Sequence, residues 1–233
     1  MTAGSALEFR DLRTADELAV LPEFERRIWG GESEMVSVNV LVATISEGGM
    51  AIGAFDGERL VGAVYGFATS EPHVLHSHYM AVDPEYRRRG LAVELKQRQR
   101  TWCLGHGVRQ MRWTYDPLQL ANAHLNLRVL GAVGISYHVN HYGSLGGING
   151  SLPSDRVTVS WDLTAAAPRP AGGAAGGVGV DVPPVSAEEI ASSAPAALEA
   201  RLAVRDALAP RLADGWLLTD IDLADRRYWL ALP

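Results

Sequence analysis

The fold of this chain is decided by the stretch Met80-Ala81-Val82-Asp83-Pro84-Glu85-Tyr86-Arg87-Arg88-Arg89-Gly90-Leu91-Ala92. It predicts an apolar β-strand that ends at Val82, a turn with three arginines and a glycine, and a helix that begins directly after the turn. The first N–H groups of a helix point the same way, at the positive end of its dipole, so such a turn suits a diphosphate. Gly90 lets the backbone approach closely because it has no side chain. The segment therefore predicts a site for a nucleotide-type cofactor.

Length and composition limit the alternatives. A chain of 233 residues, 47% of them hydrophobic, can form one large domain or a domain with an extension. The net charge of −6 argues against nucleic acid as the main partner, because that function needs a broad basic surface. We see no signal-peptide pattern and no apolar run long enough for a membrane span, so we expect a cytoplasmic protein. A single cysteine, Cys103, excludes an internal disulfide and is expected to be buried.

Periodicity and turn residues predict a mixed order of strands and helices before residue 164. The predicted strands are residues 7–12, 50–55, 60–69, 74–82, 109–115, 133–137 and 156–163, and the predicted helices are 14–29, 38–46, 91–105 and 119–130. Asp56-Gly57 is typical of a hairpin turn between two of these strands. In the helix 91–105 we expect Leu91, Leu95 and Trp102 on the apolar stripe and Lys96, Arg98 and Arg100 on the exposed face.

The remainder of the chain predicts an appended segment. Residues 165–177 are rich in Ala, Gly and Pro and are typical of a linker. Beyond them we expect a short strand at 178–182, a helix at 196–209 that ends near Pro210, and a hairpin of strands 216–222 and 227–232. Because so short a piece has little core of its own, we expect residues 178–233 to pack on the preceding domain or on a partner subunit.

The spacing Arg87-x-x-Gly90-x-Ala92 resembles the R/Q-x-x-G-x-G/A signature of the GNAT (Gcn5-related N-acetyltransferase) superfamily. The predicted order of elements is also that of a GNAT fold. Further stretches resemble a bacterial GNAT subfamily with an appended C-terminal segment: 113–119, Asn122-Ala123, Asn126, 130–132 and 153–156. The resemblance implies an α/β (α+β) domain over residues 5–164, with a mixed central sheet flanked by helices, followed by a C-terminal helix and β-hairpin.

The same resemblance implies how acyl-coenzyme A would be bound. The turn residues Arg87, Arg88, Arg89, Gly90, Leu91 and Ala92 would hold the pyrophosphate. In GNATs the pantetheine arm lies where the fourth strand and the next one splay apart. The strand end Met80-Ala81-Val82 would follow that arm, and main-chain groups of Met80 and Val82 would pair with it. Asn122 and Asn126, four residues apart on one helix face, are assigned to the cofactor, although polar helix-surface residues are the alternative.

Acyl transfer also needs a base for the amine and an acid for the leaving thiolate. His76 and His78 point to the same side of a strand, and His78 is our candidate base together with Asp116. Many GNATs carry a tyrosine acid in the helix that corresponds to 119–130, but here Leu127 occupies that position. Tyr115 is the candidate acid, and Tyr137 and Tyr142 are others. For each of these residues a packed or hydrogen-bonded structural role is the alternative.

These features together predict an enzyme that transfers an acetyl or a succinyl group from coenzyme A to the amine of a small molecule such as an amino acid. A succinyl donor would require a cation, and Arg128 or Arg156 is a candidate. The alternative is a GNAT-fold module that binds coenzyme A, or acts as a scaffold, without catalysis. We expect no metal, since His76-Ser77-His78 has no cysteine or carboxylate at ligand spacing. GNATs of this size are often dimers, so a homodimer is open.

Overall fold

The computed structural model describes residues 6–30, 35–143, 145, 151–165 and 177–233. The chain divides into two compact units, Met1–Met111 and Arg112–Pro233. The predicted linker 165–177 lies outside the described residues except for Ala165 and Gly177, and residues 138–153, between two predicted strands, are described only in part.

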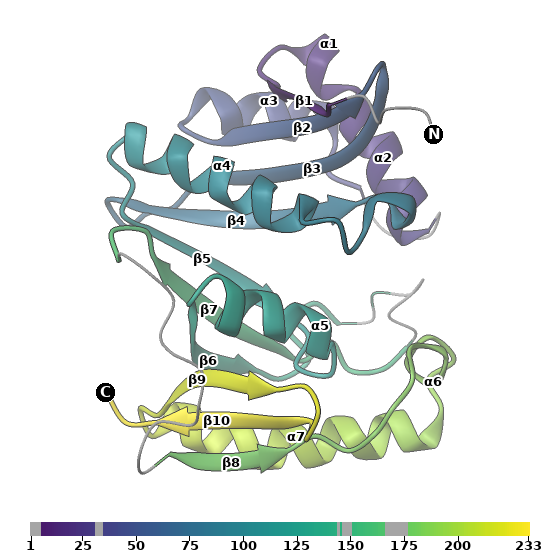
Figure 1. Cartoon of the computed structure of the whole chain (residues 1–233), viewed down its shortest axis with the longest axis vertical. Helices are drawn as coiled ribbons and strands as arrows, with labels where there is room; N and C mark the ends of the chain where they lie inside the picture. Colours follow the sequence, from purple (N-terminus) through teal and green to yellow (C-terminus); the bar gives the residue numbers. More distant parts are fainter. Residues whose placement is uncertain (1–5, 31–34, 144, 146–150, 166–176) are drawn as a thin grey trace. The chain divides into compact units, whose positions relative to one another are not determined.

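The first unit is built on four antiparallel strands in the order β1-β2-β3-β4 (Figure 1). The strands are β1 (Glu8–Asp11), β2 (Met50–Asp56), β3 (Arg59–Ala68) and β4 (Val74–Val82). The helices are α1 (Ala15–Leu18), α2 (Val20–Trp29), α3 (Val38–Ser46), the 3-10 turn η1 (Pro84–Tyr86) and α4 (Leu91–Gly105).

Helices cover both faces of this sheet. A core cluster joins Leu18, Phe24 and Leu41 of α1–α3 to strand residues such as Ala63 and Tyr65. The alternate strand residues face α4. At Gly62 of β3, for example, an added Cβ would lie 3.1 Å from the side chains of Leu91 and Leu95. Because alternate strand residues face opposite sides, α4 lies on the face opposite α1–α3, as Figure 1 shows.

The second unit contains strands in the order β5-β7-β6-β9-β10-β8. The strands are β5 (Gln110–Tyr115), which begins at the boundary, β6 (Val133–His138), β7 (Arg156–Asp162), β8 (Val178–Asp181), β9 (Leu217–Asp222) and β10 (Arg227–Ala231). The helices are α5 (Leu120–Ala123), the π-helical turn η2 (His124–Val129), α6 (Ala187–Ala191) and α7 (Pro195–Ala213). Gly134 of β6 pairs with Leu218 of β9, so the C-terminal segment continues the sheet of this unit.

Most predicted elements are present, and the predicted C-terminal helix and hairpin are confirmed. Three helices differ. The helix expected over 14–29 is two helices, although Thr14 and Glu17 form the expected N-terminal cap. The helix expected over 119–130 continues from α5 into the π-helical η2. Pro210 lies inside α7, which extends to Ala213, and the short helix α6 was not predicted.

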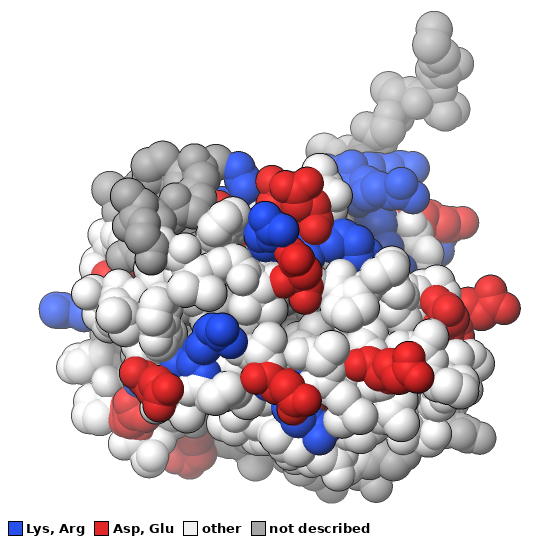
Figure 2. Space-filling view, turned by 90° about the horizontal axis from the view of Figure 1, so that it is seen from below, with Lys and Arg blue, Asp and Glu red and all other residues white. Residues whose placement is uncertain are grey.

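The surface of the molecule carries both signs of charge. On the face shown in Figure 2, basic side chains gather along one border and otherwise alternate with acidic ones. Among the described residues, no helix combines the length and apolarity that crossing a membrane requires.

The prediction that Lys96 lies on the exposed face of α4 is wrong. Lys96, the only lysine in the chain, is 3% exposed. Its Nζ donates to Ser77 Oγ of β4 at 2.8 Å and to Gln99 Oε1 at 3.3 Å. Burial lowers the pKa of the Lys96 amine to about 7. The nearby Cys103 group raises this pKa by a smaller amount. The prediction from helical periodicity counts every lysine as polar and therefore exposed. It cannot indicate a hydrogen-bond partner on another element, such as Ser77.

We therefore predict that stability rises with pH through the titration of Lys96. Below pH 7 both folded and unfolded states carry the proton, and burial of the charge costs the folded state its full penalty. Between pH 7 and the ordinary lysine value of 10.5, only the unfolded state stays protonated, so stability increases by about 1.4 kcal/mol per pH unit. From pH 7 to 8.5 the gain is roughly 1.5 kcal/mol in the free energy of unfolding.

Denaturant unfolding of the wild type and of Lys96→Met across this range measures the effect, because the variant should lack the rise. Labelling lysine with ¹³C and ¹⁵N gives a single NMR signal, since the chain has one lysine. A midpoint near 10.5, with parallel stability curves for the two proteins, would contradict the assignment.

Candidate functional site

The turn between β4 and α4 forms a site with free backbone donors. Gly90 is the N-cap of α4 and has a left-handed backbone, with φ of +82° and ψ of −6°. No side chain caps the helix there, so the N–H groups of its first turn have no side-chain acceptor. No described atom lies within 4 Å of the position that a Cβ on Gly90 would occupy. The helix start is therefore open to an anionic group, which its dipole favours.

The three arginines of the turn are exposed beside this opening. Arg87 Nε donates to the Val82 carbonyl at 3.1 Å and so folds back on the end of β4. Arg88 has a positive φ of 59°, and Arg89 lies over the ring of Tyr86 at 5.5 Å. Leu91 is buried and Ala92 is half-buried, so helix packing fixes the other side of the turn. In β4, Ala81 and Val82 are buried and Met80 is half-buried.

Asp83 fixes the conformation of this turn. Its carboxylate is buried and accepts hydrogen bonds from Arg59 Nη2 at 2.9 Å and from the Glu85 backbone N–H at 3.1 Å. Its own backbone N–H donates to Val61 of β3, and its carbonyl accepts from Tyr86. Tyr86 in turn donates from its hydroxyl to Asp56 at the hairpin. The turn is thus bonded to β3 at several points before the helix begins.

His78 occupies a special position in β4. Tyr65 pairs with Tyr79 and Gly66 with Ser77, so His78 is the extra residue of a β-bulge. A bulge re-aims the side chain that it carries. The His78 ring lies among aromatic rings, 5.7 Å from Tyr65 and 5.6 Å from Phe67 between centroids. His78 is nevertheless exposed to solvent, and partial desolvation by these neighbours lowers its pKa, so the imidazole is neutral and able to accept a proton at neutral pH.

Glu25 of α2 is an acidic residue that the sequence did not single out. It is 3% exposed, its Oε2 accepts from the Val36 backbone at 3.4 Å, and its Oε1 has no hydrogen-bond partner among the described residues. Burial raises the pKa of Glu25 to about 7. Burial also raises the pKa of the Tyr79 hydroxyl, and the charge of Glu25 raises it further. Helical periodicity does not distinguish a buried glutamate from an exposed one, because both occur at polar positions of a helix.

In the second unit, Tyr115 and Asp116 are held by residues of the C-terminal segment. The Tyr115 hydroxyl donates to the Tyr228 hydroxyl of β10 at 3.4 Å, and Tyr228 donates to the Pro117 carbonyl at 2.8 Å. Burial raises the pKa of the Tyr115 phenol, which therefore stays protonated. Asp116 forms a bidentate ion pair with Arg201 of α7, with Nη2 and Oδ2 2.8 Å apart, and it also accepts from the Leu118 N–H.

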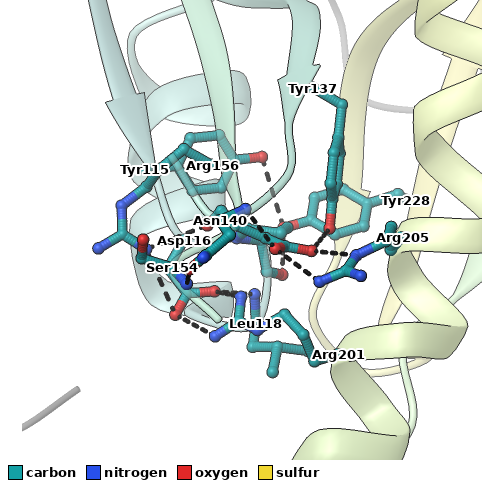
Figure 3. A network of polar contacts seen from close by, with 12 residues as sticks. Tyr115, Asp116, Leu118, Tyr137, Asn140, Ser154, Arg156, Arg201, Arg205 and Tyr228 are labelled. Carbon is teal, nitrogen blue, oxygen red and sulfur yellow. Dashed lines mark hydrogen bonds and ion pairs between the residues drawn. The ribbon is translucent and has the colours of Figure 1, made fainter. Parts of the chain in front are cut away.

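Asp155 forms the second centre of this network. It is fully buried and accepts from Arg205 of α7 at 2.8 and 2.9 Å, from the Tyr137 hydroxyl at 2.7 Å and from the Asn140 N–H at 3.0 Å. Figure 3 shows Arg201 and Arg205 projecting from the helix toward these strand ends. Arg128, a candidate cation, instead contacts Asp220 and the Ile221 carbonyl.

The structure does not give Asn122 and Asn126 a shared environment. Asn122 is exposed, whereas Asn126 is 4% exposed and accepts from Trp113 Nε1 at 3.2 Å. The reason is the π-helical turn, whose wider winding separates residues four apart that an α-helix would align. The expectation of one common face is therefore wrong. Leu127 is buried, as expected of an apolar residue at that position.

Two hollows of about 400 and 470 Å³ lie next to Trp102 in the first unit. Neither is lined by residues of the turn or by His78. We assign them no chemistry. Among the described residues, no group of three His, Cys, Asp or Glu side chains is placed to hold a metal ion.

Residues 20–132, which include the whole turn, match the acetyltransferase (GNAT) family. The chain contains a GNAT acetyltransferase domain. The predicted family and enzyme class are confirmed, and the match favours an enzyme over a scaffold. None of the curated proteins matches the sequence of this chain.

Solved structures share the GNAT fold. The ribosomal-protein-S18-alanine N-acetyltransferase of Escherichia coli is 17% identical, with a TM-score of 0.57 over 69% of this chain and 96% of its own. The putative acetyltransferase yncA of Salmonella typhimurium, solved with acetyl-CoA, is 16% identical, with a TM-score of 0.54 over 71% and 99%. Arabidopsis thaliana NAA60, solved with a bisubstrate analogue, is 16% identical, with a TM-score of 0.53 over 67% and 99%. The predicted fold class is confirmed.

We predict that Asp83 is required for the shape of the GNAT turn. Asp83→Ala leaves the Glu85 N–H without its acceptor and removes one of the two carboxylates that Arg59 contacts, so it should lower the free energy of unfolding by about 1–3 kcal/mol. Amide hydrogen exchange over residues 85–92 should become faster. The matched control is Asp181→Ala, which removes an exposed ion pair with Arg227 and should change neither quantity appreciably. Unchanged exchange in the turn of Asp83→Ala would show that other contacts hold it.

Proposed function

We propose that this GNAT domain transfers an acyl group from an acyl-coenzyme A to the amine of a small molecule such as an amino acid. The observation that supports the proposal most is the uncapped start of α4 at Gly90, open to solvent and flanked by three arginines. A diphosphate fits these donors in charge and in geometry. The proposed ligands are the turn residues Arg87–Ala92 and the main chain of Met80–Val82, the latter along the pantetheine arm.

The reaction moves the acyl group from sulfur to nitrogen. The C–S bond breaks as the C–N bond forms, the amine loses a proton, and the thiolate gains one. We assign the proton acceptor to His78, because its ring is re-aimed by the bulge, is accessible to solvent and is kept neutral by a lowered pKa. Asp116 is the weaker candidate, since Arg201 occupies both of its oxygens. Tyr115 remains the proposed acid, because burial keeps its phenol protonated.

The donor's acyl group is proposed as acetyl, with succinyl as the second candidate. Of the two cations that a succinyl carboxylate could use, Arg128 is engaged by Asp220 and Ile221, which leaves Arg156 as the better candidate. Turnover with acetyl-coenzyme A but none with succinyl-coenzyme A would remove the second candidate.

Calorimetric titration with coenzyme A tests the proposed site. The wild type should bind, and the double variant Arg89→Glu, Gly90→Asp should lose at least tenfold in affinity, because it places two negative charges at the helix start. Gly105→Ala, at the other end of α4 where a Cβ meets no neighbour, is the matched control and should bind like the wild type. If the double variant and the wild type bind coenzyme A with equal affinity, the turn is not the binding site of the diphosphate.

The pH dependence of kcat/KM tests His78. The acidic limb of the wild-type profile should have its midpoint below the ordinary histidine value of 6.5, since desolvation lowers the pKa. His78→Gln should reduce kcat/KM by about 10²–10⁴ and remove this limb. His76→Gln and Glu25→Gln are the comparison variants and should retain it. If Glu25→Gln removes the limb and His78→Gln does not, the proton acceptor is Glu25.

A further inference from the structure

Around Asp116 and Asp155, the described residues place three guanidinium groups beside two carboxylates. Arg201 pairs with Asp116 and Arg205 pairs with Asp155, each through two hydrogen bonds. Each carboxylate is therefore already matched by a guanidinium from α7. Arg156 of β7 is the third guanidinium in the cluster, and the part of the chain that the structure describes places no third carboxylate within ion-pair distance of it.

The contacts of Arg156 show that it is the surplus cation. Its side chain is 11% exposed, and its nearest carboxylate oxygen, on Asp116, is 3.9 Å away. Among the described residues, its hydrogen bonds end at one acceptor, the Asp155 main-chain carbonyl at 3.0 Å. Burial lowers the pKa of Arg156, the charge of Asp116 partly offsets this effect, and the charge of Arg201 lowers the pKa again. A nearly buried guanidinium with unused donors is costly unless an anion neutralises it.

The surroundings of Arg156 indicate where such an anion would enter. Its guanidinium lies 5.6 Å from the ring of Tyr142, which is 45% exposed. The Tyr142 hydroxyl is 3.1 Å from Thr114 Oγ1, so polar groups line this side. Arg201 adds a second positive charge, and its buried Nε has no hydrogen-bond partner among the described residues.

We propose that Arg156, together with the neighbouring Tyr142 and Arg201, binds a carboxylate group of a substrate, which carries one negative charge. One negative charge balances the surplus of one positive charge, and the planar guanidinium fork matches a carboxylate. A phosphate dianion would overcompensate. The assignment of this carboxylate to a substrate rests on the proposed function. The binding of a carboxylate at Arg156 does not depend on it.

Thermal unfolding of the full chain without coenzyme A tests the site independently of acyl transfer. Sodium N-acetylalaninate represents the carboxylate of an amino acid, and sodium succinamate, also a monoanion, represents that of a dicarboxylic acyl group. At ten times its Kd, the carboxylate that fits should raise the melting temperature by about 3–5 °C over sodium chloride of equal ionic strength. The neutral amides N-acetylalaninamide and succinamide should have no effect. Which carboxylate acts identifies its source.

Arg156→Gln should abolish this shift, whereas Arg227→Gln, at an exposed ion pair in the same unit, should keep it. The proposal is overturned if the wild type shows no shift, if the shift persists in Arg156→Gln, or if inorganic phosphate alone produces it. In the ligand-free protein, Arg156→Met should hold or raise the melting temperature, because it removes an unmatched charge. Arg201→Met should lower it. Equal losses in both variants would make Arg156 a structural partner of Asp116 and contradict the proposal.

Discussion

The left-handed conformation of Gly90 is the constraint on which the proposed chemistry depends. A residue with a side chain is strained at a φ of +82°, and a carboxylate or hydroxyl cap at that position would consume the N–H groups that the helix leaves free. Glycine satisfies both requirements. Asp83 then holds the preceding residues against β3, so that the open helix start has a defined direction rather than that of a loose loop.

Buried charge is a second theme of the molecule, and its two units handle it differently. In the first unit, Lys96 and Glu25 are buried with pKa values near neutrality, and the hydrogen bonds described for them go to uncharged groups. In the second unit, two aspartates and two arginines form matched bidentate pairs between strand ends and α7. The C-terminal segment is therefore tied to this unit by ionic bonds as well as by the strand pairing of β6 and β9.

The sequence predicted the elements that have local signals. Ser37 and Gly90 are the N-cap residues of α3 and α4, and both helices have the predicted bounds. The burial of Met111, Trp113 and Tyr115 along β5 also follows from their alternation. The π-helical turn at His124–Val129 has no comparable signal, because it depends on how the surrounding elements pack rather than on a residue type. Its consequence is the loss of the expected Asn122–Asn126 face.

The candidate site could be predicted where the chain is contiguous and not where it is assembled from distant segments. The turn at 87–92 is read from adjacent residues. By contrast, the environment of Asp116 depends on Arg201, 85 positions away, and that of Asp155 depends on Arg205, 50 positions away. Nothing in α7 except its arginines marks it as their partner, and several other arginines were equally available.

The most direct test of the central claim is an NMR titration of ¹⁵N-labelled protein with coenzyme A. If the free N–H groups at the start of α4 bind the diphosphate, the amide signals of residues 90–93 should shift the most and should respond to 3′-phosphoadenosine diphosphate as well. Shifts confined to other parts of the chain, with these four amides unchanged at saturation, would contradict the account.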